Sequence, residues 1–112
     1  MSTPLTISYH LVAPPAERRK RTIYTVPHGG RAKIEEVEIY FPPGTYGELK
    51  VRLLYGAMKA WPGSDWTSGD NCAIRGRANV TYGPGEGVRL EYVNENDSQV
   101  RECFITLRGA LE

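Results

Sequence analysis

The sequence is poor in the residues that most often carry catalysis or bind metals. Its 112 residues include two histidines and two cysteines, without a CxxC pair or the His/Cys cluster that a zinc site requires. His10 lies on the polar side of an alternating segment and His28 stands in a Pro-Gly-Gly turn, so we expect neither to act as a general base. A phosphate-cradling loop is also missing, because the glycines at 83–87 have no lysine or helix start behind them. We therefore expect a protein that is not an enzyme and that uses no metal and no cofactor.

Long hydrophobic runs are absent as well. No run approaches the roughly 18 apolar residues of a membrane span, and the opening MSTPLTISYHLV lacks the basic start and continuous apolar stretch of a signal peptide. We expect a soluble protein with no membrane association. Without a secretory signal, Cys72 and Cys103 are expected to be reduced thiols that pack as small hydrophobes. One disulfide is the alternative, if the two cysteines lie on facing strands.

What the sequence does contain is a two-residue alternation of apolar and polar side chains, interrupted by 12 glycines and 8 prolines. No segment keeps a 3.6-residue period over ten positions, so helices are not expected. The alternation predicts an all-β fold, either a two-sheet antiparallel sandwich or a jelly roll of seven to eight strands, in a single domain over residues 1–112. The alternating segments are 5–11, 21–26, 37–41, 49–55, 72–82, 88–92 and 101–107, with a further short piece before Trp61.

Three irregularities in this pattern carry their own predictions. Ile34 falls out of phase with the residues after it, which predicts a bulge or a change of sheet. Gly56 interrupts its segment and predicts a kink, with the strand continuing through Met58 and Ala60. Phe104 lies on the opposite face from the apolar residues of the last strand, which indicates that both faces of that strand are partly covered.

The charge is unevenly placed along the chain, although the net charge is only +1. Residues 1–33 hold six basic side chains and one acidic side chain, whereas the remainder holds eight basic and twelve acidic ones. The first 33 residues therefore form a basic N-terminal strand or arm. Two interpretations are open: a positive and a negative side that favour head-to-tail association or docking on an acidic surface, or strands that interleave and cancel the asymmetry.

A basic run is the first candidate binding feature. Its phosphate-binding potential, with Tyr24 nearby to stack on a base, indicates nucleic acid as one partner. On a strand, however, four consecutive residues point to both faces, so about half of them could meet one groove. We therefore favour an acidic protein surface over nucleic acid. The candidate basic docking patch consists of Arg18, Arg19, Lys20 and Arg21.

The segment WPGSDWTSGDN at 61–71 is the second candidate, predicted as a long exposed loop that holds both tryptophans. The loop has three interpretations: a sugar-stacking platform, an anchor in a protein interface, or a tryptophan that folds back to plug one end of the sandwich. Its acidic residues lack the dense repeat of a calcium loop. The candidate interface or ligand-contacting residues are Trp61, Asp65, Trp66, Asp70 and Asn71.

Three stretches carry a resemblance to a known group of proteins: residues 39–56, with Phe-Pro-Pro-Gly at 41–44; residues 60–71, ending in Gly-Asp-Asn; and residues 91–109, with a polar turn before a final strand. Together they resemble small β-sandwich proteins found among the virion genes of tailed viruses. The basic N-terminal portion and the cysteine pair depart from that pattern.

The resemblance implies a structural component of a virus particle, such as a capsid decoration, neck, tail or fibre protein. Such a protein would be made in the cytoplasm of the host, reside in the virion, form a homo-oligomer and bind other capsid or tail proteins. The alternative function is a carbohydrate-binding β-sandwich module that uses the loop with Trp61 and Trp66.

Overall fold

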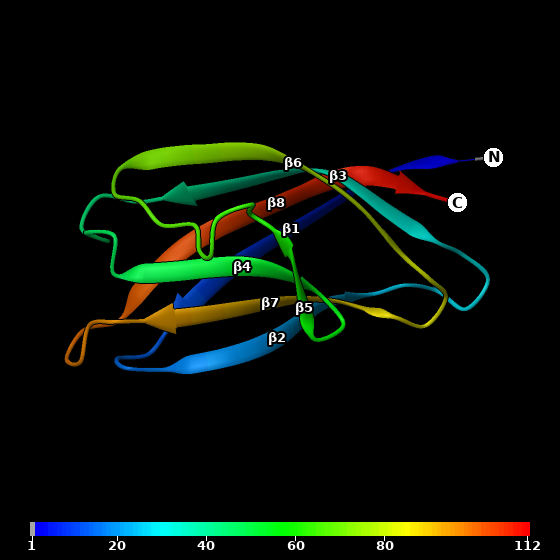
Figure 1. Cartoon of the computed structure of the whole chain (residues 1–112). Coiled ribbons are helices and arrows are strands. Elements are labelled where there is room, and N and C mark those ends of the chain that lie inside the picture. Colours follow the sequence, from blue (N-terminus) through cyan, green and yellow to red (C-terminus); the bar gives the residue numbers. More distant parts are fainter. Residues whose placement is uncertain (1) are drawn as a thin grey trace.

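The computed structural model describes residues 2–112, which form eight strands in two four-stranded antiparallel sheets (Figure 1). Within these residues there is no helix, and hence none that could cross a membrane. The all-β prediction is therefore confirmed. The strands are β1 (Thr3–Ala13), β2 (Arg18–Thr25), β3 (Ala32–Phe41), β4 (Leu49–Tyr55), β5 (Met58–Trp61), β6 (Cys72–Tyr82), β7 (Gly87–Asn94) and β8 (Arg101–Leu111).

The strand order defines the architecture. Sheet A has the order β1-β8-β3-β6, and sheet B has the order β2-β7-β4-β5. Most connections pass from one sheet to the other, so that strands distant in sequence become neighbours in space, as the two layers in Figure 1 show. This is the order of an eight-stranded jelly roll, one of the two predicted sandwich architectures.

The core lies between the sheets because alternate residues of each strand point inward. Ile105 and Leu107 of β8 and Leu90 of β7 are at most 1% exposed, and they belong to one buried apolar cluster fed by both sheets. Tyr82 also points inward, and its hydroxyl donates a 2.6 Å hydrogen bond to the carbonyl of Leu54. The buried phenol is thereby satisfied, as an interior polar group must be.

The bulge predicted at Ile34 is present. The register of β3 shifts between Ile34 and Glu36 against both β6 and β8. At the same level of β8 stands Gly109, where a Cβ would lie 1.7 Å from the carbonyl oxygen of Lys33. Only glycine allows the two backbones to approach this closely.

The kink predicted at Gly56 is wrong, because the chain reverses there. Tyr55 pairs with Met58, which leaves Gly56 and Ala57 as the two-residue turn of a hairpin between β4 and β5. Gly56 has a φ of 60°, a left-handed conformation that suits the twist of such a hairpin.

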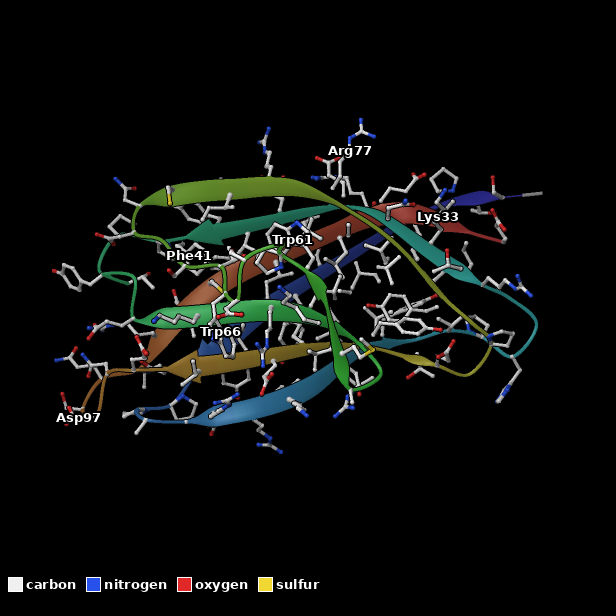
Figure 2. All side chains as sticks on the ribbon, viewed as in Figure 1. Lys33, Phe41, Trp61, Trp66, Arg77 and Asp97 are labelled. Carbon is white, nitrogen blue, oxygen red and sulfur yellow. The ribbon has the colours of Figure 1, made fainter. Side chains whose placement is uncertain are left out.

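Trp61 lies between the two sheets rather than at the surface (Figure 2). It ends β5, is 8% exposed, and packs against β6 so closely that a Cβ at Gly76 would lie 2.7 Å from its indole nitrogen. The prediction of an exposed loop holding both tryptophans is therefore wrong for Trp61. The observed arrangement is the one in which a tryptophan folds back into the sandwich.

The two cysteines are free thiols. Cys103 lies on β8 and Cys72 on β6, and β3 separates these two strands within sheet A. The facing arrangement that a disulfide needs is thus not formed. Burial raises the pKa of the Cys103 thiol to about 12, so it packs as an apolar group.

Candidate functional site

Trp66, the second tryptophan of the 61–71 loop, is half-buried against the outer face of sheet B. The guanidinium of Arg52 on β4 lies 4.1 Å from the centre of its ring, and that of Arg18 on β2 lies 5.5 Å away. Both are cation–π distances. The indole is therefore already occupied by contacts within the chain.

Beneath these two guanidinium groups lies a buried carboxylate, Glu91 of β7, which is 5% exposed. Its oxygens are 2.6 Å from Arg52 and 3.3 Å from Arg18. Burial alone would raise the pKa of Glu91, but the hydrogen bonds and charges of Arg52 and Arg18 outweigh it and lower the pKa below its usual value. Strands β2, β7 and β4 are thus tied together by one polar cluster capped by Trp66.

The remaining candidate residues of the loop do not converge with Trp66 on one site. Asp70 accepts hydrogen bonds from the backbone amides of Gly44 and Thr45 at 2.8 and 3.1 Å, which links the β5–β6 loop to the β3–β4 loop. Asn71 adopts a left-handed φ of 51°, while Asp65 is exposed. Over residues 2–112, no group of three or more His, Cys, Asp or Glu side chains is placed to hold a metal ion.

The basic run divides between two directions, as predicted for a strand. Lys20 is in register with Glu91 and points outward from sheet B, as does Arg18. Arg19 and Arg21 alternate with them and lie on the inner face of sheet B, at its edge, in register with Tyr92 and Leu90. Arg21 lies beside Tyr92. The four residues therefore do not form one basic patch.

The charge asymmetry along the chain is only partly cancelled in space. Strand β1 carries no acidic or basic residue other than His10, and β2 holds its four basic residues on the edge of sheet B, beside β7 with its one acidic residue, Glu91. Among the six basic side chains of residues 1–33, Arg18 pairs with Glu91 and Lys33 pairs with Glu35. The strand pairing does not decide between the two interpretations of the charge pattern, and both stay predictions.

The feature that sequence reasoning missed is a row of aromatic side chains across the outer face of sheet A. His10 of β1 is in register with Phe104 of β8, which is in register with Tyr40 of β3. The rings of His10 and Phe104 are stacked, with centres 4.4 Å apart and planes 6° apart, and Tyr40 lies 6.2 Å from Phe104. We call these three residues the aromatic row.

The aromatic row is exposed to solvent. Phe104 is 42% exposed and Tyr40 is 40% exposed, and Val12 beside the row is 45% exposed. Phe104 is thus partly covered, as predicted for the second face of the last strand, but by the neighbouring rings of His10 and Tyr40 rather than by another layer. No segment of residues 2–112 packs over this side of sheet A, whose strands are all engaged with sheet B on the other side.

A charged band lies next to the aromatic row on the same face. Glu38 accepts hydrogen bonds from Arg108 at 3.1 Å and from Arg75 at 3.3 Å, and the Arg108 bond is the main cause of its lowered pKa. Further along, Glu36 of β3 is in register with Arg108 of β8. A shallow hollow at the edge of the band is lined by Glu35, Glu36, Arg75, Gly76 and Arg77.

The aromatic row escaped prediction because its members are far apart in the sequence. The alternation places each of them on the outward side of its strand, but only the strand order and register bring them together. No protein-family model matches the chain, and comparison with curated proteins gives no match either.

Proposed function

We propose that this chain is a non-enzymatic structural protein that works through protein–protein contacts as a building block of a virus particle. The observation that carries the proposal is the exposed aromatic row on the outer face of sheet A. Aromatic side chains gathered on a flat, uncovered surface are typical of protein interfaces. The charged band beside the row supplies the polar surroundings that such interfaces also have.

Two further observations support a place in a virion. The jelly roll is an architecture of viral capsid domains, although lectins and cupins share it. The resemblance of residues 39–56, 60–71 and 91–109 to small virion proteins points the same way. Fold and resemblance are analogies, so the surface of this chain carries the argument for binding. The partners we propose are other copies of the chain and capsid or tail proteins.

The carbohydrate-binding alternative has less support. It relied on two exposed tryptophans in one loop, and Trp61 is buried while Arg52 covers the ring of Trp66. An exposed aromatic face free to stack on a sugar is therefore not available at either residue. A glycan array on which the protein binds, with binding lost in Trp66→Ala, would restore this alternative.

Co-sedimentation with virus particles, or with capsid and tail proteins encoded beside this gene, tests the proposal. We expect the wild-type chain to bind a particle component and Phe104→Ser to lose at least tenfold in affinity, because the exposed ring is removed from the contact surface. Thr25→Ser is the matched control, since Thr25 is an exposed residue of β2 at the edge of sheet B.

Circular dichroism and thermal unfolding establish that both variants are folded, which is expected because Phe104 and Thr25 are exposed. A folded wild-type protein that stays monomeric and binds no particle component would contradict the proposal.

A further inference from the structure

From the outer face of sheet A we infer that two copies of this chain pair face to face across a two-fold axis that runs parallel to the strands between β8 and β3. The inference rests on the proposed function in that it uses the same face, and it adds the partner, a second copy, and the geometry. A two-fold interface must be self-complementary, so that residue i meets residue j and j meets i. The face of sheet A can be tested against that requirement row by row.

The strand order fixes which strands meet. Sheet A has the order β1-β8-β3-β6, so its centre lies between β8 and β3. A two-fold axis through that centre and along the strands lays β8 of one copy over β3 of the second copy. Residues that are in register within one sheet then face each other between the copies, because such an axis leaves positions along the strands unchanged.

The aromatic row satisfies the requirement. Phe104 and Tyr40 are in register on the two central strands, so Phe104 of each copy faces Tyr40 of the other. Two aromatic pairs form, one on each side of the axis. Aromatic pairs of this kind contribute beyond the apolar area they bury.

The charged band satisfies it as well. Arg108 and Glu36 are in register four residues further along, so Arg108 of each copy faces Glu36 of the other. The same operation places Thr106 opposite Glu38, and it opposes no two charges of one sign on the central strands. Opposite charges thus meet at two symmetric points of the pair.

The other in-plane axis, perpendicular to the strands, fits less well. It reverses the rows, so that Tyr40 would face the carboxylate of Glu36 and Phe104 would face Arg108. The aromatic rings would then no longer meet one another, and neither charge would meet an opposite charge. The axis parallel to the strands is therefore the arrangement that matches apolar with apolar and positive with negative.

Size and twist are compatible with this pairing. The 11 residues of β8 extend about 36 Å, and four strands span about 19 Å, so each face offers about 700 Å² and the pair buries about 1,400 Å². Stable interfaces bury roughly 1,200–2,000 Å². Stacked sheets cross at about 30°. If the two copies cross at the level of Thr106, the aromatic row and the row of Arg108 are each displaced sideways by about 3 Å relative to the other copy. An arginine side chain is long enough to span that displacement.

A mixing experiment with two charge-reversed variants tests the inference. In Arg108→Glu, the new carboxylate faces Glu36 of an identical copy, and in Glu36→Arg, the new guanidinium faces Arg108 of an identical copy. Each variant alone is therefore expected to dissociate at least tenfold more readily than the wild type. In a one-to-one mixture both contacts become attractive again, so mixed dimers are expected with near wild-type affinity.

Sedimentation velocity gives the dissociation constants, and circular dichroism shows that each variant is folded. Arg89→Glu is the matched control, because Arg89 lies on β7 in sheet B, away from the proposed interface. A wild-type monomer, or variants whose dimerisation is unchanged or is not restored by mixing, would overturn the two-fold pairing. If Phe104→Ser still abolishes binding to a particle component in that case, the proposed function stands and only the identity of the partner is wrong.

Discussion

Glu91 shows how a charged residue is accommodated on the outer face of sheet B. Its carboxylate is almost fully covered, and its charge is balanced by Arg52 and Arg18 rather than by water. Removing one partner of such a pair leaves the others desolvated without compensation. At the residue scale, this cluster and the contact of Trp61 with Gly76 are the points where single substitutions have the largest expected effects.

We expect Glu91→Gln to lower the free energy of unfolding at pH 7 by about 1–3 kcal/mol, because the amide cannot replace the charge between two guanidinium groups. The lowered pKa of Glu91 also sets a pH dependence. The stability that ionised Glu91 contributes is fully present above the ordinary glutamate pKa of 4.5. It is lost as the pH falls through the lower pKa that Glu91 has in the folded protein. Urea unfolding at pH 7 and pH 3 checks both, and the difference between wild type and variant should shrink at pH 3.

Glu95→Gln is the control for this prediction. Glu95 pairs with Lys50 at 3.0 Å, but its side chain is 51% exposed, so the change should cost less than about 1 kcal/mol. Equal losses of unfolding free energy in Glu91→Gln and Glu95→Gln would contradict the prediction that burial makes the Glu91 ion pairs more stabilising than an exposed pair.

Gly76→Ala is expected to destabilise the protein by about 1–3 kcal/mol, since the added methyl group meets the indole of Trp61 in a packed interior. Gly63→Ala is the matched control, because a Cβ there meets nothing within 4 Å and the change should stay within about 0.5 kcal/mol. Thermal unfolding followed by tryptophan fluorescence measures both. Trp61 would not be packed on β6 if Gly76→Ala were as mild as the control.

The burial of Trp61 could not be predicted from its local sequence. Its neighbours Pro62, Gly63 and Ser64 are turn formers, which indicate an exposed loop. What takes the indole inside is the absence of a side chain at Gly76, fifteen positions along the chain, and the hairpin that brings β5 across the sandwich. The surroundings of Trp66 could not be predicted from local sequence either, because its ring is covered by Arg52 and Arg18 from two different strands.

At the scale of the elements, strands were predictable where alternation is local and regular. The segments 49–55, 72–82 and 101–107 became β4, β6 and β8 because alternate residues of each turn toward the core and most of the others are polar, a pattern that needs no knowledge of partners. The out-of-phase Ile34 identified the bulge in β3 for the same reason. Register was not predictable, and the aromatic row depends on register alone.

The loops that join the sheets at one end are held by Asp70. We expect Asp70→Ala to accelerate hydrogen exchange at the backbone amides of Gly44 and Thr45 by at least tenfold, because both lose the carboxylate that accepts their hydrogen bonds. Nuclear magnetic resonance measures the exchange of each amide. Asp65→Ala, in the same loop but exposed, should leave these rates unchanged. Unaltered exchange in Asp70→Ala would mean that the two loops are not coupled through this side chain.

At the scale of the whole molecule, the two sheets enclose one buried cluster to which Cys103 belongs. The thiol is 0% exposed, and burial raises its pKa to about 12, so it is both inaccessible and protonated in the folded state. We expect Cys103 to react with iodoacetamide at pH 8 only when the sandwich opens, at a rate that follows global unfolding. Mass spectrometry of peptides across a urea series checks this, and rapid labelling of Cys103 without urea would contradict it.

The basic run of the chain lies on one edge strand of the whole molecule. A jelly roll pairs early strands with late ones, and β2 lies at the edge of sheet B beside β7, whose one acidic residue, Glu91, pairs with Arg18. A second kind of sidedness arises from the uncovered outer face of sheet A, which combines exposed aromatic residues with alternating charges. That face is the surface through which we propose the protein assembles.

Hydroxyl-radical footprinting of the free and the assembled protein tests this claim most directly, since it needs no variant. Phe104 and Tyr40 are predicted to lose reactivity on assembly, whereas Tyr46 and Met58, which are 72% and 75% exposed and lie outside the face, should remain reactive. Protection of Tyr46 or Met58, with Phe104 and Tyr40 as reactive as in the free chain, would contradict the assignment of the outer face of sheet A as the binding surface.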